Sequence, residues 1–281
     1  MYIDQIITSI IYLIAVLFIL FLGKWVYNML NPKFNLKEEL VKNDNFALAL
    51  AVVGYLFGLV LAMGGILEGP SLGWKDDVID IVFYGITSII LLNISIIINN
   101  KIIMYKFDNI KELITDKNAG TGIVEAANHI AMGLIIFGSV SGEGGSLITF
   151  VVFWISGQVM LILSTFIYNL ILPFDLHEHI EKDNVAVGVS FAGMIIALGN
   201  IIRIGLSGNF TSWQDSLVKF AIFTCFGIIM LPVIRFITDK VLLPGERLTD
   251  ELVNQETPNI GAGAIEAFSY IGASFLIGWV F

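Results

Sequence analysis

The sequence predicts an all-α integral membrane protein with eight transmembrane helices, arranged as two parallel four-helix repeats. Three observations lead to this fold class. Hydrophobic residues make up 57% of the chain and charged residues 14%, with a mean hydropathy of +0.86, far from the composition of a soluble domain. The hydrophobic residues fall into runs long enough to cross a bilayer. The second half of the chain also repeats motifs of the first.

Each predicted span has the length that a helix needs to cross about 30 Å of hydrocarbon, which is about 20 residues. The spans are about 5–30, 45–67, 78–101, 118–140, 145–171, 184–206, 216–240 and 259–281. Charges, glycine or proline separate each span from the next. The remaining segments are too short to bury these runs, so the protein is predicted to be multi-pass. Cys225 lies within the seventh span, and we interpret it as a packing residue.

The basic residues predict the orientation, because lysine and arginine are retained on the cytoplasmic side during insertion. Of the 15 lysines and arginines, all but Lys75, Arg203 and Lys219 lie in or beside the loops after the first, third, fifth and seventh spans. Both termini are therefore predicted to be extracytoplasmic. Tryptophans near span ends agree with this, and Trp154 is the exception.

The repeat is visible as motifs that recur at an offset of about 140 residues. The recurring pairs are Tyr27-Asn28 and Tyr168-Asn169, Asp44-Asn45 and Asp183-Asn184, Trp74 and Trp213, Lys101 and Lys240, and the stretches 118–126 and 259–267. We predict two domains, residues 1–142 and 143–281, with four helices each. An even number of spans gives both copies the same orientation, so we expect them to be related by an axis along the membrane normal.

Two motifs carry a resemblance to a known family. The Asp-Asn-x-Ala entry to the second helix and the Asn-x-Gly-x-Gly-x-x-Glu-Ala entry to the fourth helix occur in both halves. They resemble the bacterial membrane family called domain of unknown function 350, also uncharacterised protein family 0719, over nearly the whole chain. The resemblance implies a bacterial inner-membrane protein built of four-helix units, and it implies no particular activity.

Glu125 and Glu266 are the first candidates for function, because a carboxylate inside a transmembrane helix is costly and usually faces protein or water. Only 15 residues follow Glu266 in a chain of 281, so it lies inside the predicted cytoplasmic edge of the hydrocarbon. We expect both carboxylates to face protein or water and to border a common axis. A structural hydrogen-bonding role is the alternative.

Other polar and small residues surround these carboxylates in the predicted arrangement. They are Asn118, Gly120, Gly122, Asn259, Gly261 and Gly263 at the start of the fourth helices, and Asp44, Asn45, Asp183 and Asn184 at the start of the second helices. Asparagine and aspartate are good helix N-caps, and glycines allow close helix packing. Capping and packing are the plainer roles, and a polar cavity facing the cytoplasm is the functional one.

Histidines give a weaker signal. His129 lies four residues after Glu125 on the same helix face, which suits a proton relay or a bond between helices. Its counterpart Tyr270 cannot relay protons in the same way, so we favour the bond between helices. His177 and His179 lie in a loop with spacing that is poor for a metal, and we assign them to a solvated surface.

Together these features predict a channel or transporter for a small ion or polar solute. The alternative is a non-catalytic membrane scaffold or stress-response interaction protein. We expect no enzyme activity, since the sequence has no nucleophile elbow, zinc motif, phosphate loop or dinucleotide fingerprint. We likewise expect no cofactor, no metal and no nucleic-acid partner, with lipid as the main surrounding. The sequence leaves the formation of a homo-oligomer open.

Overall fold

Apolar runs form long helices in the computed structural model, which describes residues 2–243 and 245–281. Eight helices in this part of the chain are long and apolar enough to cross a membrane. They are α1 (Tyr2–Leu30), α3 (Phe46–Leu67), α4 (Trp74–Ile102), α6 (Ala119–Val140), α7 (Leu147–Ile171), α9 (Val185–Leu206), α10 (Trp213–Ile237) and α11 (Ile260–Val280). The predicted all-helical membrane fold with eight spans is confirmed.

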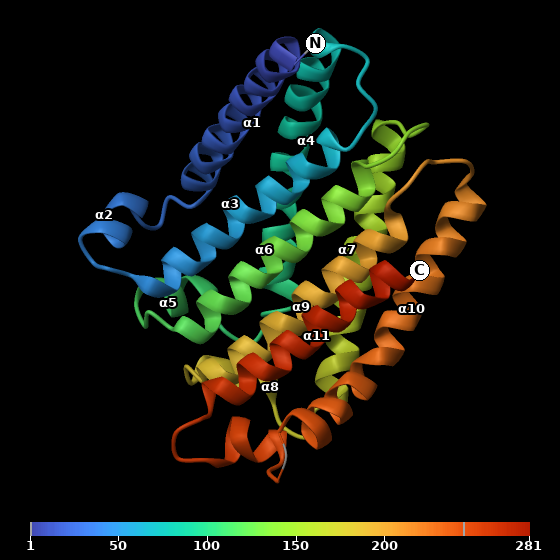
Figure 1. Ribbon diagram of the computed structural model, residues 1–281. Coiled ribbons are helices and arrows are strands. Elements are labelled where there is room, and N and C mark those ends of the chain that lie inside the picture. The colour runs from blue at the N-terminus through green and yellow to red at the C-terminus, as the bar shows by residue number, and fades with distance from the viewer. Residues whose placement is uncertain (1, 244) are drawn as a thin grey trace.

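Short helical segments connect the spans at one end of the bundle. They are α2 (Leu36–Val41), α5 (Asn109–Ile114), α8 (Leu176–Glu181) and the π-helical segments η1 (Thr238–Leu242) and η2 (Asp250–Asn254). Helices α3, α6, α9 and α11 all begin at this end (Figure 1). We call it the N-cap end, and by the charge distribution it is the end predicted to face the cytoplasm.

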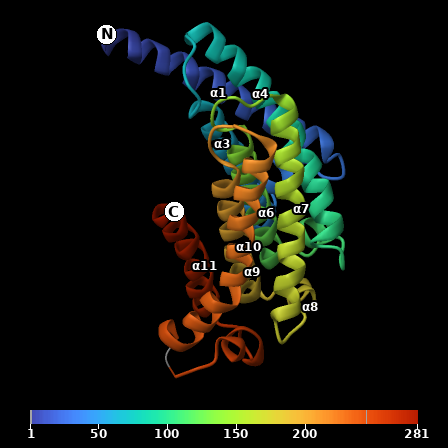
Figure 2. The same ribbon diagram turned by 90° about the vertical axis from the view of Figure 1, so that its right-hand side faces the viewer.

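The spans form two layers. The front layer consists of α3, α6, α9 and α11, which run side by side in one direction (Figure 1), each packed along the next. The back layer consists of α1, α4, α7 and α10, which run in the opposite direction. Helix α4 packs on α3 and α6, α7 packs on α6 and α9, and α10 packs on α9 and α11. In Figure 2, which is turned by 90°, α7 lies to the right of α6 and α9.

The order of the front layer corrects one expectation from the sequence. If the two fourth helices bordered a common axis, α6 and α11 would pack against each other. Instead α9 packs along both α6 and α11 and lies between them. The halves therefore follow one another head to tail, as units of a repeat array do. A central axis flanked by Glu125 and Glu266 is wrong for this fold, although both halves do run in the same direction.

Glycines bring the front-layer backbones into close contact. A Cβ added to Gly133 of α6 would lie 2.2 Å from the carbonyl oxygen of Gly58 in α3. A Cβ on Gly199 of α9 would lie 2.6 Å from the Cα of Ala131 in α6. Small residues at such contacts allow tight packing of helices in lipid, where no hydrophobic effect drives association. Glycines thus allow close packing between neighbouring front-layer helices.

The positions of Cys225 and Trp154 differ from what an apolar run or a belt of tryptophans at the span ends would suggest. Cys225 is exposed on the surface of α10 and is therefore not an interior packing residue; an apolar run alone does not say which face of a helix meets lipid. Trp154, which did not fit a belt at the span ends, is buried in α7. Its Nε1 donates to Ser95 Oγ of α4 at 3.0 Å, so the indole joins the two halves.

Candidate functional site

Asparagines cap all four front-layer helices. The side chains of Asn45, Asn118, Asn184 and Asn259 each accept a hydrogen bond from a backbone N–H in the first turn of α3, α6, α9 and α11. Asp44 and Asp183 precede two of these caps with φ of 46° and 55°, the left-handed region that aspartate tolerates. Asp183 also accepts from Gly120 N at 3.1 Å, which ties α9 to α6.

Three of these asparagines also connect their helix to the next short segment. Asn45 Nδ2 donates to the Leu113 carbonyl of α5 at 2.8 Å. Asn118 Nδ2 donates to the Ile180 carbonyl of α8 at 2.7 Å, and Asn184 Nδ2 donates to the Leu252 carbonyl of η2 at 2.9 Å. Three of the four caps therefore also fix the spacing of neighbouring helices at the N-cap end, and Asn259 makes no such bond among the described residues.

The predicted glycines lie at helix contacts. A Cβ on Gly122 would lie 2.5 Å from the Ala47 carbonyl oxygen, and one on Gly263 would lie 2.3 Å from the Ala186 carbonyl oxygen. Gly120 faces the backbone of Asn184, whereas a Cβ on Gly261 would meet only the cap side chain of its own helix. Three of the four glycines thus permit a close approach, and Gly261 lies at the open edge of the layer.

Glu125 is buried in α6, with 2% of its surface exposed. Its Oε1 accepts from Asn109 Nδ2 of α5 at 2.6 Å. Its Oε2 lies 3.5 Å from His129 Nε2, one turn further along the helix. No arginine or lysine pairs with Glu125 among the described residues, and its direct polar contacts are with one amide donor and one imidazole.

His129 bridges two helices, as the sequence favoured. Its Nδ1 lies 3.0 Å from the Ala51 carbonyl oxygen of α3, and its ring lies edge-on to Tyr55, with centroids 5.9 Å apart. The carbonyl oxygen can only accept a hydrogen bond, so Nδ1 carries a hydrogen. The Nε2 of a neutral imidazole then has a lone pair, and this atom lies 3.5 Å from Glu125 Oε2.

Glu266 occupies the equivalent place in α11 with no exposed surface, but its partners differ. Arg235 of α10 forms an ion pair with its Oε1. Ser190 of α9 donates to Oε2, and Tyr270 donates to Oε1 at 3.3 Å. Every one of these groups is a donor, so the arrangement favours an ionised carboxylate. Arg235 is held in turn by Thr249 Oγ1 at 3.3 Å.

Sequence reasoning missed Arg235 and Asn109 as partners of the glutamates. Arg235 was counted with the loop charges, because it lies near the end of its span. Its counterpart in the repeat is Ile96, five residues before Lys101 as Arg235 is five before Lys240. This loss of symmetry was the available signal, because an arginine that appears in only one copy of a repeat needs a local partner.

Unpaired polar atoms gather on the first half. The described part of the chain gives no hydrogen-bond partner to Thr121 Oγ1, His129 Nε2, Asn109 Oδ1 or either amide atom of Asn128, and all of them are buried. Thr121, Asn128 and His129 belong to α6. In α11 the counterpart of Asn128 is Ser269, which donates to the Ile265 carbonyl at 2.7 Å. Buried polar atoms without partners are rare in folded proteins, and a bound water or ion or a functional role can explain them.

A cavity of about 400 Å³ lies at the opposite end of the bundle from the caps. Tyr12, Asp77, Asp80, Glu143 and the loop that ends α6 are among its lining residues. Asp77 Oδ2 accepts from Ser71 at 2.6 Å and from Tyr12, so this carboxylate is engaged in the wall. None of the residues predicted for the pathway lines this cavity, and all of them lie toward the N-cap end.

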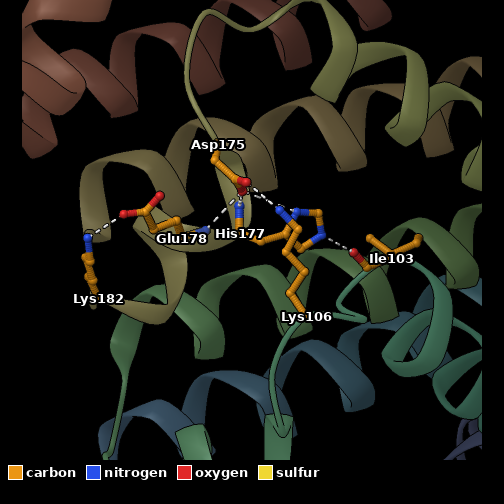
Figure 3. A network of polar contacts seen from close by, with 6 residues as sticks. All are labelled: Ile103, Lys106, Asp175, His177, Glu178 and Lys182. Carbon is orange, nitrogen blue, oxygen red and sulfur yellow. Dashed lines mark hydrogen bonds and ion pairs between the residues drawn. The ribbon is translucent and has the colours of Figure 1, made fainter.

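A second polar network joins the halves at the N-cap end (Figure 3). Lys106, from the loop after α4, forms an ion pair with Asp175 at the start of α8. His177 Nε2 donates to the Ile103 carbonyl at 2.7 Å, and its side chain is buried. The assignment of His177 to a solvated surface is therefore wrong, because the segment after α4, with Ile103, Tyr105 and Phe107, lies against it.

Titration of this network follows from its contacts. Burial lowers the pKa of His177 below its ordinary value, and Lys106 adds to this effect, while the bond to Ile103 and the charge of Asp175 oppose it. The hydrogen bond from Lys106 lowers the pKa of Asp175. Glu178 and Lys182 pair at 2.5 Å on the exposed face of α8, and their charges add little to stability.

Comparison with known proteins identifies relatives of the whole chain. Residues 1–140 and 144–281 each match the family model described as Domain of Unknown Function (DUF350). A "UPF0719 transmembrane protein" of Aquifex aeolicus (strain VF5) is 23% identical over 270 residues, 94% of this chain and 97% of the relative. The "UPF0719 transmembrane protein YshE" of Bacillus subtilis (strain 168) is 26% identical over 117 residues, 42% of this chain and 81% of the relative. No solved structure matches.

Proposed function

This chain belongs to the family described as Domain of Unknown Function (DUF350), and on that premise we propose that it is a non-enzymatic pathway for protons across the bacterial inner membrane. In this proposal the Glu125–His129 pair of the first half carries the proton. Glu266 is held ionised by Arg235 and supports the fold. The relatives come from bacteria, and the distribution of basic residues supports an orientation in which the N-cap end faces the cytoplasm.

One observation carries the proposal. His129 Nε2, which carries the lone pair of a neutral imidazole, lies 3.5 Å from a carboxyl oxygen of Glu125 in a buried place. Two lone pairs at such a distance repel, unless one proton lies on the carboxyl group or on the imidazole. The pair therefore has one proton to hold and to release, and histidine with a carboxylate is a common pair in intramembrane proton relays.

The surroundings suit a proton better than a larger solute. Protons move along side chains and water, whereas a hydrated ion needs an open route. The glycine contacts between α3, α6 and α9 leave little room for such a route. At the opposite end, the cavity lined by Asp80 and Glu143 would collect cations. At the N-cap end, Asn109 connects Glu125 to α5.

A scaffold is the second candidate. The same close packing favours it. Glu125 does not line the cavity, and the two lie toward opposite ends of α6. A scaffold needs no transfer of protons and gives Glu125 a structural role only.

Proton flux separates the two candidates. The protein is reconstituted in liposomes that contain a pH-sensitive dye, and a potassium diffusion potential drives protons inward. We expect the wild-type protein to acidify the lumen and Glu125→Gln, which keeps size and polarity but loses the ionisable group, to abolish the flux. Replacing protons by sodium or potassium as the driven ion should give no flux.

The matched control is Glu38→Gln, an exposed carboxylate at the N-cap end, which should conduct as the wild type does. Folded wild-type protein that carries no protons would move the conclusion to the scaffold. A Glu125→Gln protein that conducts normally would remove Glu125 from the pathway.

A further inference from the structure

We propose that this chain assembles head to tail with further copies of itself, with α11 of one copy packed against α3 of the next at the N-cap end. The proposal does not depend on proton transfer. It rests on a repeating contact that runs through the chain and is left incomplete at both edges.

The repeating contact is formed by the front layer. Helix α3 packs on α6, α6 on α9 and α9 on α11 in one direction. The junction between the halves, α6 against α9, is thus the same kind of contact as those within each half. A head-to-tail contact of this kind leaves one unsatisfied surface at each end, and further copies can satisfy it.

The capping asparagines make the same hydrogen bond at successive contacts of this series. Asn45 donates to Leu113 and Asn118 donates to Ile180. Leu113 is the fifth residue of α5, and Ile180 is the fifth residue of α8. Asn184 continues the series to Leu252 in η2. Each cap thus binds the short segment that precedes the next front-layer helix.

The series stops at Asn259. This cap is exposed, whereas Asn45, Asn118 and Asn184 are buried, and its Nδ2 reaches no carbonyl of a following segment. It donates to Glu251 Oε2 at 2.6 Å within its own connection. At the other edge, Leu40 is the fifth residue of α2, and its carbonyl accepts no hydrogen bond from the described residues. Asn259 of one copy and the Leu40 carbonyl of the next would complete the series.

The sizes of the exposed side chains on α11 and α3 suit a contact in which the two helices meet at the N-cap end. There the facing positions are small, with Gly261 and Ala264 exposed on α11 and Ala49 partly exposed on α3. Toward the other end they are large. Phe268 and Trp279 of α11 are 69% and 78% exposed, and they take the places of Ala127 and Gly138 in α6. Helix α11 of one copy and α3 of the next would therefore lie closest at their N-caps and further apart toward their other ends.

Exposed apolar surface alone does not carry this inference, because lipid covers such surface as well as protein does. Helix α1 is nevertheless consistent with it. Its counterpart α7 packs on two front-layer helices, α6 and α9. Helix α1 packs on one front-layer helix, α3, and on α4, so the place that α6 occupies beside α7 is not filled beside α1 by a described helix. In the assembly, α11 of the preceding copy takes that place. Because α11 and the neighbouring α3 would lie closer at one end than at the other, each copy would be rotated relative to the next. Such a rotation favours a closed ring over a filament.

Cysteine crosslinking in membranes tests the contact with the full-length protein. In a Cys225→Ser background, copies with Ala49→Cys and copies with Gly261→Cys carry different tags and are expressed together. We expect a disulfide between the two differently tagged copies. The matched control pair is Phe83→Cys with Ile155→Cys, which lie on exposed faces of the back layer and should not crosslink. Crosslinks only between two Gly261→Cys copies would overturn the head-to-tail contact.

A second variant tests the hydrogen bond itself. In a Glu251→Gln background, Asn259→Asp keeps the oxygen that caps α11 and loses the donor, so the crosslinked fraction should fall and the protein should shift to monomers in single-molecule photobleaching. Asn254→Asp, an exposed asparagine of the same connection, should change neither readout. Undiminished crosslinking of Asn259→Asp, or wild-type protein that is monomeric in membranes, would contradict the proposal.

Discussion

The first and second halves share one scaffold and differ in charge. Both start their front helices with asparagine caps, and both bury a glutamate seven residues after the cap. In the second half an arginine and two hydroxyl groups hold Glu266. In the first half an amide and an imidazole hold Glu125. The backbone of a repeat can thus stay the same while its two buried carboxylates acquire different partners.

The difference lies in neighbouring helices more than in the helix that bears the glutamate. Arg235 comes from α10, where the first half has Ile96 in α4. Ser190 comes from α9, where the first half has Ala51, whose carbonyl binds His129 instead. A buried charge depends on the donors that surround it. The partners of a carboxylate therefore decide whether it is a fixed charge or a proton site.

The largest expected effect comes from breaking the ion pair of the second half. Arg235→Leu leaves Glu266 charged and buried without its cation, which costs about 3–5 kcal/mol for comparable pairs. We expect a strong loss of thermal stability in detergent, measured by the temperature at which the protein aggregates. Adding Glu266→Gln should recover much of the loss. Arg247→Leu, an exposed arginine of the following loop, serves as the control, and an equal effect there would contradict a specific role for Arg235.

The comparison of the halves also explains what the sequence could predict. Spans, caps and the two intramembrane glutamates follow from local patterns, because hydropathy, cap chemistry and the cost of buried charge act within a single helix. The lateral order of helices does not, since equal orientation allows both a rotation axis and a head-to-tail array. Arg235 and Asn109 were missed for the same reason, because their partners lie on other helices. The burial of His177 likewise depends on how α8 packs against the segment that follows α4.

Grafting the arginine into the first half sharpens the comparison. Ile96→Arg places a cation at the position that matches Arg235, on a helix that packs against α6. We expect it to pair with Glu125 and to fix the carboxylate in its charged form, so that proton flux falls to the level of Glu125→Gln while the protein remains folded. The flux assay in liposomes and gel filtration measure the two properties.

Ile96→Gln provides the control for size and polarity at this position and should keep more of the proton flux. An Ile96→Arg protein that is folded and conducts as well as the wild type would show that the two halves are not equivalent in space at this position, or that Glu125 does not carry the proton.

The smallest effect is expected at the contact between the halves, where His177 meets the Ile103 carbonyl. Because the folded-state pKa of His177 lies below its ordinary value of 6.5, the histidine is neutral in both states above that pH and adds no pH dependence there. As the pH falls below 6.5, the unfolded chain binds a proton before the folded protein does, so stability decreases by at most about 1.4 kcal/mol for each pH unit until the folded pKa is reached. His177→Gln retains an amide donor for Ile103 and cannot titrate, so its melting temperature should fall less than that of the wild type between pH 6.5 and more acidic values. His179 and the Asp175–Lys106 pair are present in both proteins, so their contributions cancel in the comparison. If melting temperature falls with pH equally in the two proteins, His177 is not the group that weakens this contact in acid.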